Sequence, residues 1–228
     1  MLQGIVKKIA DNKNNQSLSH QYRSRRFDLF KSLLKELPRP LRILDIGGTV
    51  EFWQAMNFQE PEVSITLLNL EDPQPLEAPY TAIKGDATDL SGMANGEYDI
   101  VFSNSVIEHL YTWQNQQQMA AEVLRVGQHH FIQTPNYWFP IEPHWVFPFF
   151  QYFPKAVRRL LTQYCSLGHI GRIKDAAAAR NQVNEIRLLS KKEMQQLFPQ
   201  SEIYAEKFLG FNKSYTAYSF TNQAHRSR

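Results

Sequence analysis

The sequence predicts an α/β fold, in which helices cover both faces of a doubly wound, mostly parallel β-sheet. Three observations carry this prediction. Short apolar stretches recur along the middle of the chain, and several are apolar nearly throughout, as strands are when both sheet faces are covered. A helical pattern separates two of these stretches, and interleaved strands and helices favour parallel pairing. The length of 228 residues agrees with one large domain.

The composition excludes several classes of protein. Cys165 is the single cysteine, so we expect neither an internal disulfide nor a zinc site built on cysteines. A net charge of +3 is too small to indicate a nucleic-acid partner. The N-terminus lacks the apolar core of a signal peptide, and no stretch reaches the ~18 uninterrupted apolar residues of a membrane-spanning helix. We therefore expect a cytoplasmic protein with no transmembrane segment.

The first predicted element is an amphipathic helix over 22–37, within an N-terminal cap helix region of 1–40. Its apolar residues recur at three- and four-residue steps, which is typical of a helix that packs on a core: Phe27, Phe30, Leu33, Leu34 and Leu37. The segment ELPRP ends the helix, because proline disfavours helical continuation. The helix either covers a ligand site, with Tyr22 and Arg26 as candidate contacts, or supports the sheet.

Five apolar stretches predict the parallel strands. They occupy residues 41–46, 63–69, 80–84, 98–103 and 129–134. A helix over 113–126 separates the last two. Near the C-terminus, Ser190 and Glu193 form a capping box that begins a further helix. Residues 201–209 and 213–220 then predict an antiparallel pair, which gives the sheet an antiparallel C-terminal edge strand.

An aromatic-rich insertion over 136–185 follows the fifth predicted strand. Aromatic residues and prolines crowd 137–164, with a basic helical stretch at 155–161 and a polar connector at 174–182. The insertion can pack as core or as a homodimer contact, lie on a membrane surface, or close over a substrate. The lid interpretation is favoured, because ligand pockets prefer apolar walls and because the prolines interrupt any continuous amphipathic helix.

Small, polar or acidic residues follow each of the first four predicted strands. The four groups are Asp45, Gly47, Gly48 and Thr49, then Asn69, Leu70 and Glu71, then Asp86 and Ala87, then Ser103, Asn104 and Ser105. In open α/β sheets, ligands bind beyond the carboxyl ends of the strands, so these residues predict a binding site. The third glycine of a dinucleotide motif is absent, and Glu51 places a negative charge where a diphosphate would lie. We therefore expect a ligand without a diphosphate.

Four motifs resemble those of class I S-adenosylmethionine-dependent methyltransferases: ILDIGG, NLED, GDATDL and YDIVFSNSVIEHL, in this order. The resemblance spans residues 41–135 by motif, and 134–145 is similar to a segment of some bacterial small-molecule members. It implies a Rossmann-like fold and a single methyltransferase domain over 1–228, with a cap at 1–40 and a lid at 136–185. It also implies S-adenosylmethionine as cofactor and a small or lipophilic acceptor. Nothing in the sequence requires a metal.

The resemblance implies roles for the residues after the first two strands. Gly47 and Gly48 would pass beside the methionine part of the cofactor, and Asp45 would orient this loop and help to hold the cofactor's amino group. The second strand normally ends in an acid that binds the ribose hydroxyls. Asn69 occupies this position and lacks the charge of an acid, so either Asn69 or Glu71 holds the ribose. Asp45 alternatively caps the turn that follows it.

The resemblance also implies roles for the residues after the third and fourth strands. Asp86 and Ala87 would contact the adenine, through the carboxylate of the first and a backbone N–H. Ser103, Asn104 and Ser105 would face the transferred methyl group. An Asx turn is the alternative role of Asp86.

Two histidines are candidates for chemistry on the acceptor. Glu108 and His109 follow the fourth strand, and His144 lies in the insertion, with Glu142 as its candidate orienter. A histidine titrates near neutral pH and can act as a general base, although each of these can equally be a structural residue. Two other functions stay open. One is a catalytically silent cofactor-binding scaffold, and the other is a nucleotide-dependent oxidoreductase, which the incomplete glycine pattern disfavours.

Overall fold

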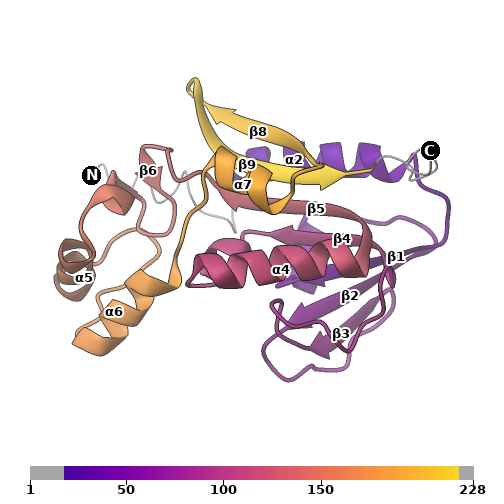
Figure 1. Cartoon of the computed structure of the whole chain (residues 1–228), viewed down its shortest axis with the longest axis horizontal. Coiled ribbons are helices and arrows are strands. Elements are labelled where there is room, and N and C mark those ends of the chain that lie inside the picture. Colours follow the sequence, from indigo (N-terminus) through magenta and orange to yellow (C-terminus); the bar gives the residue numbers. More distant parts are fainter. Residues whose placement is uncertain (1–17, 221–228) are drawn as a thin grey trace.

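The computed structural model describes residues 18–220 and confirms the predicted α/β fold (Figure 1). A seven-stranded sheet has the strand order β3-β2-β1-β4-β5-β9-β8. Its strands are β1 (Leu41–Ile46), β2 (Val63–Asn69), β3 (Tyr80–Lys84), β4 (Tyr98–Asn104), β5 (Gly127–Pro135), β8 (Glu202–Phe208) and β9 (Phe211–Ser219). The first five pair in parallel, and β9 is antiparallel to both β5 and β8. Residues 1–17 of the expected cap region lie outside the described residues.

The strand bounds agree closely with the sequence prediction. β1, β2 and β3 begin and end at the predicted residues, and β4 and β5 extend beyond them. The predicted antiparallel pair is β8 and β9, with β8 at the outer edge and β9 beside β5. Strand order reverses between β1 and β4, which is the switch point where open α/β sheets bind ligands.

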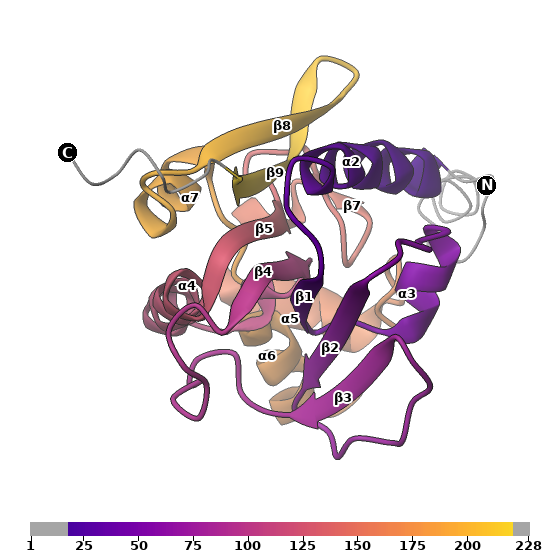
Figure 2. The same cartoon turned by 90° about the vertical axis from the view of Figure 1, so that its right-hand side faces the viewer.

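Helices cover both faces of the sheet (Figure 2). The helices of residues 18–220 are α2 (Leu18–Leu34), α3 (Val50–Ala55), α4 (Trp113–Val126), α5 (Lys155–Tyr164), α6 (Ala176–Glu185), α7 (Lys191–Leu197) and the 3₁₀ helices η1 (Ile107–His109) and η2 (Phe150–Tyr152). One apolar cluster joins α4 and α7 to the sheet through Met119, Val123 and Met194. A second cluster joins α2 and α3 to the sheet through Phe30 and Trp53. The sheet therefore lies between two helical layers.

The predicted apolar face of α2 enters an aromatic core. Phe30 is fully buried, and its ring centroid lies 4.9 Å from that of Phe102 and 5.2 Å from that of Phe131. Trp53 of α3 packs 5.2 Å from Phe102. Burial of each such side chain stabilises the fold by roughly 1.5–3 kcal/mol. The helix begins and ends earlier than predicted, and it supports the sheet, which is one of its two expected roles.

The polar connector predicted at 174–182 is wrong, because the helix α6 occupies this segment. Asp175 caps it by accepting a hydrogen bond from Ala178 N at 2.7 Å. Alanine has the highest helix propensity and aspartate is a preferred N-cap residue, so the local sequence favours a helix. Ala179 and Val183 are buried, which shows that α6 packs rather than merely connects.

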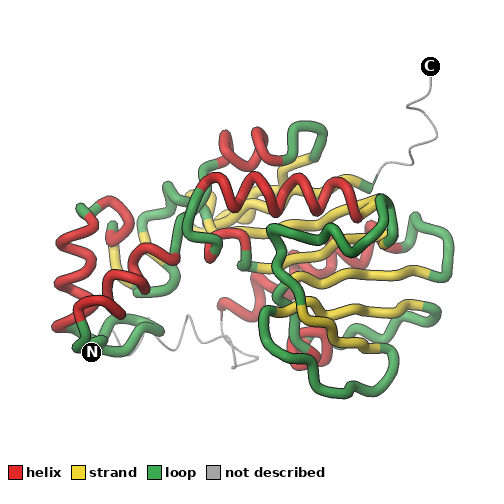
Figure 3. The backbone as a smooth tube through the Cα atoms, turned by 60° about the horizontal axis from the view of Figure 1, so that its bottom comes forward, coloured by secondary structure: helices red, strands yellow, loops and turns green. Residues whose placement is uncertain are grey.

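The aromatic insertion forms a lobe with an apolar core of its own. Figures 1 and 3 show α5 and α6 side by side at one end of the sheet. Trp145 and Phe150 are buried in this core, and their rings stack with centroids 4.4 Å apart. Trp138 and Phe149 are instead 64% and 53% exposed, so only part of the aromatic excess is core. Among the helices of residues 18–220, none combines the length and apolar character needed to cross a membrane.

Candidate active site

The loops after β1, β2, β3 and β4 lie side by side at one edge of the sheet. Gly47 N donates to Leu68 O at 2.8 Å, and Gly85 N donates to Asn69 O at 2.9 Å. β4 pairs in parallel with β1, so its end reaches the same edge. The ends of the four strands that carry the predicted cofactor residues therefore lie together along this edge.

Gly47 and Gly48 leave the first of these loops without a covering side chain. Gly47 has a φ of +73°, and a Cβ there would lie 2.5 Å from Val106 Cγ2. A Cβ on Gly48 would lie 1.7 Å from Asp45 Oδ2. Both separations are far below van der Waals contact, so both positions require glycine. The exposed backbone can then meet a ligand directly.

Asp45 lies beneath this loop and faces the interior. Its side chain is buried and accepts a hydrogen bond from Trp53 Nε1 at 2.7 Å. Burial raises the pKa of Asp45 to about 8, although the hydrogen bond from Trp53 acts in the opposite direction. This position suits the predicted role of orienting the loop, whereas the carboxylate does not lie on the exposed side of the loop.

The remaining predicted residues at the ends of β1 and β2 divide into structural and exposed groups. Thr49, at the end of the glycine loop, caps α3 by accepting from Phe52 N at 3.3 Å. Asn69 Nδ2 donates to Gly48 O at 3.0 Å and so joins the ends of β1 and β2. Leu70 is 71% exposed, and Glu71 is also exposed. An exposed leucine at a strand end is available to pack against a ligand.

Asp86 forms the Asx turn that was its alternative role. Its Oδ1 accepts from Thr88 N at 2.8 Å and from Thr88 Oγ1 at 2.7 Å. The residue is exposed and the adjoining Ala87 is buried. The turn holds the carboxylate in place at the end of β3, so structural and binding roles are compatible here.

Ser103, Asn104 and Ser105 do not share one environment. Ser103 is fully buried, and its hydroxyl donates to Ile46 O at 3.1 Å, so it lies inside the sheet. Side chains alternate between the two faces of a strand, and at the end of β4 only Asn104 and Ser105 extend beyond the helices that cover the sheet. Asn104 and Ser105 line a cavity, where Ser105 Oγ donates to Gln133 Oε1 at 2.9 Å.

This cavity has a volume of about 420 Å³ and lies beyond the ends of β4 and β5. The first turns of α2, the aromatic insertion and the hairpin of β8 and β9 form its other walls. Six residues that were predicted as ligand contacts or catalytic candidates line it: Tyr22, Arg26, Asn104, Ser105, Glu108 and His144. A second cavity of about 610 Å³ lies between the insertion and the start of α4, and none of the predicted cofactor-binding or catalytic residues line it.

A buried ion pair crosses the wall of the 420 Å³ cavity. Arg26 Nη1 lies 2.9 Å from Glu206 Oε2, and Arg26 Nη2 donates to Asn104 Oδ1 at 2.8 Å. Burial lowers the pKa of Arg26, while the charge of Glu206 opposes this shift. Arg26 is among the contacts predicted from the sequence, whereas Glu206 is not. Glu206 lies on β8, and no local pattern connects two residues so far apart in the chain.

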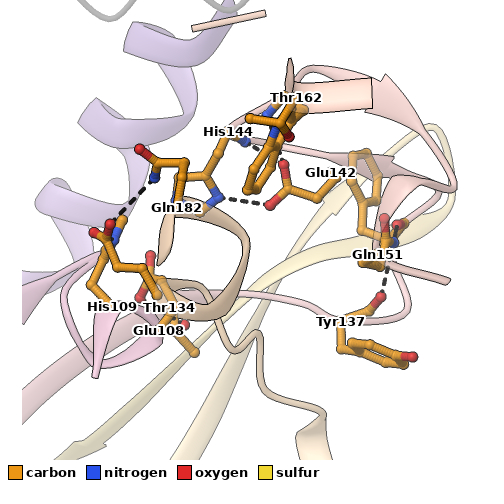
Figure 4. A network of polar contacts seen from close by, with 12 residues as sticks. Glu108, His109, Thr134, Tyr137, Glu142, His144, Gln151, Thr162 and Gln182 are labelled. Carbon is orange, nitrogen blue, oxygen red and sulfur yellow. Dashed lines mark hydrogen bonds and ion pairs between the residues drawn. The ribbon is translucent and has the colours of Figure 1, made fainter. Parts of the chain in front are cut away.

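Glu108, His109 and His144 meet at the edge of the same cavity (Figure 4). The two imidazole rings are perpendicular, with centroids 4.9 Å apart. His109 Nδ1 lies 2.9 Å from Glu185 Oε1, and His144 Nδ1 lies 2.7 Å from Glu142 Oε1. Each histidine thus has a carboxylate that orients its ring, as predicted for Glu142 and missed for Glu185.

Electrostatics differ between Glu108, which is fully buried, and His144, whose side chain is 18% exposed. Burial raises the pKa of Glu108, against the opposing charges of His109 and His144. Burial lowers the pKa of His144, but the hydrogen bond and charge of Glu142, with the charge of Glu108, outweigh this and raise it overall.

Comparisons with known proteins agree with this architecture. A family model for a methyltransferase domain matches residues 53–130 of the 228. A search of curated proteins by sequence found no match. The strand order matches a Rossmann-like methyltransferase fold, and the match to a methyltransferase domain agrees with it. The predicted resemblance to class I S-adenosylmethionine-dependent methyltransferases is confirmed.

Three solved structures share the fold at low identity. A Rhodobacter sphaeroides protein assigned to the Zn-dependent alcohol dehydrogenases is 12% identical, with a TM-score of 0.53 over 82% of this chain and 86% of that one. An Aquifex aeolicus S-adenosylmethionine-dependent methyltransferase is 10% identical, with a TM-score of 0.50 over 95% and 96%. The CurJ carbon methyltransferase is 10% identical, with a TM-score of 0.51 over 86% of this chain and 52% of that one. At sequence identities this low, these structures show only that the fold is shared.

Proposed function

We propose that this protein transfers a methyl group from S-adenosylmethionine to a small or lipophilic acceptor bound in the 420 Å³ cavity. The observation that carries the proposal is that the segment after β4 lies between the glycine loop and this cavity. Asn104 and Ser105 line the cavity, while Val106 packs against Gly47. A cofactor on the loop and an acceptor in the cavity would therefore be neighbours, which a direct transfer requires.

The strand-end loops fit this cofactor. When bound, S-adenosylmethionine supplies a methyl group on a positively charged sulfur. The bare backbone of Gly47 and Gly48 would contact its amino-acid part. The Nδ2 atom of Asn69 is engaged with Gly48 O, so the exposed carboxylate of Glu71 is the better candidate for the ribose hydroxyls. The exposed carboxylate of Asp86 would accept a hydrogen bond from the amino group of the adenine.

The cavity suits an acceptor with an apolar body and a polar end. Phe139, Ile141 and Phe208 contribute apolar wall, and Arg26 and Gln133 contribute polar groups. Pockets of this composition bind small molecules by apolar contact and fix their orientation with a few polar groups. In such a transfer, the chain would act chiefly by holding the acceptor in line with the methyl group, an effect that can supply about 7–11 kcal/mol.

Calorimetry with S-adenosylmethionine, S-adenosylhomocysteine and NAD tests the proposed cofactor. We expect the first two to bind at one site per chain and NAD not to bind, because the loop lacks a diphosphate site. Binding of NAD alone, or of none of the three, would contradict the proposal.

We expect Asp86→Ala to weaken S-adenosylmethionine binding at least tenfold, which corresponds to about 1.4 kcal/mol. The variant removes the carboxylate proposed to contact the adenine. Asp89→Ala is the matched control, because Asp89 is also exposed and holds a similar turn through Ser91 N. Calorimetry should find the control close to wild type. Equal affinities of Asp86→Ala and Asp89→Ala would reject the adenine assignment.

A further inference from the structure

We propose that Glu108, His109 and His144 bind a divalent transition metal in the wall of the 420 Å³ cavity. One ligand atom of each residue lies within 4.8 Å of the others. Glu108 and His109 come from η1, and His144 comes from the insertion, so the cluster exists only when the lobe is folded against the sheet. Nothing in the sequence requires a metal, and these residues come from segments that lie far apart in the chain.

A buried oxygen without a partner lies in this cluster. Glu108 is fully buried, and its Oε2 accepts from Thr134 Oγ1 at 3.0 Å. Its Oε1 has no hydrogen-bond partner among the described residues. A buried carboxylate oxygen that is left unpaired destabilises the folded state. A cation bound beside Oε1 would remove this cost.

Both histidines are hydrogen-bonded to a carboxylate through one ring nitrogen, as metal-binding histidines commonly are. Their Nδ1 atoms are bonded to Glu185 and Glu142 at 2.9 and 2.7 Å. Glu142 is itself fixed, since its Oε2 accepts from the backbone N–H groups of His144 and Trp145. A carboxylate on Nδ1 sets the tautomer and leaves Nε2 as the donor to a metal.

The ligand set indicates the kind of metal. Two imidazoles and one carboxylate suit zinc, iron, cobalt or manganese, whereas magnesium and calcium prefer oxygen ligands alone. Ligands at about 2.1 Å from a tetrahedral metal lie about 3.4 Å apart, so side-chain shifts of about 1 Å would close the site. Three protein ligands leave a position open, and Glu108 and His144 line the cavity, so this position would face the acceptor.

Metal binding can be tested separately from methyl transfer. Full-length protein without an affinity tag is stripped with a chelator and titrated with Co²⁺, and the visible absorption of the bound ion is recorded. Zn²⁺ competition follows. We expect one equivalent of Co²⁺ to bind and Zn²⁺ to displace it. No cobalt band at millimolar Co²⁺ would overturn the proposal, whether or not S-adenosylmethionine binds.

Variants distinguish this site from adventitious binding. Glu108→Gln removes the negative charge of one metal ligand. Glu185→Gln changes a side chain that is 32% exposed and orients His109, and it should weaken the affinity for Co²⁺ by about 10–100-fold. His129→Gln is the control, because His129 lies at the opposite end of β5 and bonds to Ser219 O. Circular dichroism checks that each variant is folded. Cobalt affinity that is unchanged in folded Glu185→Gln and Glu108→Gln, or lost equally in His129→Gln, would also overturn the proposal.

Discussion

We expect Glu206→Ala to lower the free energy of unfolding by about 3–5 kcal/mol, the range for removing one partner of a buried ion pair. The Glu206 side chain is 4% exposed and lies 2.9 Å from Arg26 Nη1. Lys213 Nζ lies 3.4 Å from its other carboxylate oxygen, to which Ser214 Oγ donates at 3.3 Å. Alanine would leave the buried guanidinium of Arg26 with Asn104 as its remaining hydrogen-bond partner.

Urea unfolding at neutral pH measures this loss, with Glu202→Ala as the matched control. Glu202 lies on the same strand but is exposed, and it accepts from Tyr218 OH at 2.7 Å. Its removal should cost no more than about 1 kcal/mol. The double variant Arg26→Met/Glu206→Leu removes both charges and should recover much of the stability. A loss in Glu206→Ala no larger than in Glu202→Ala would show that the pair is not stabilising.

The predictable part of the fold is local. A strand that is covered on both faces has a short apolar stretch, and this pattern predicts the bounds of β1 and β2 correctly. The bounds of β3 are also predicted correctly, although β3 is an edge strand with partly exposed residues. The capping box was equally readable, and both of its bonds form: Ser190 N donates to Glu193 Oε2 at 2.8 Å, and Glu193 N donates to Ser190 Oγ at 3.3 Å. In each case, residues close in the chain decide the structure.

The unpredictable part depends on contacts between distant segments. The pairing of Arg26 with Glu206 follows from the position of β8 beside β9, which no spacing in the sequence encodes. His144 meets His109 only because the insertion folds back on η1. Ser103 is buried because the covering helices extend as far as this residue of β4, which the sequence of the strand does not indicate. The glycine loop was predictable because Gly47 and Gly48 follow the apolar stretch of β1 directly in the sequence.

Asp45→Asn is expected to change how stability depends on pH. The pKa of Asp45 is raised to about 8 by burial, against about 3.9 for an unfolded aspartate. Between these values, the folded state holds a proton that the unfolded state has released, so the free energy of unfolding falls as pH rises. The slope is at most about 1.4 kcal/mol per pH unit and ends above the folded-state pKa. Asparagine keeps an acceptor for Trp53 Nε1 and carries no titrating proton.

Thermal or urea unfolding from pH 5 to pH 9, without cofactor, measures this difference. The stability of Asp45→Asn relative to wild type should increase steadily up to about pH 8 and then become constant, since Asp45 is ionised in both states beyond that point. Asp28→Asn is the control, because the Asp28 side chain is 71% exposed and the same charge is removed. Its stability should follow wild type across this range. If the wild-type and Asp45→Asn curves were parallel, Asp45 would be ionised beneath Gly48 in the folded protein, and the loop would rest on a charged carboxylate.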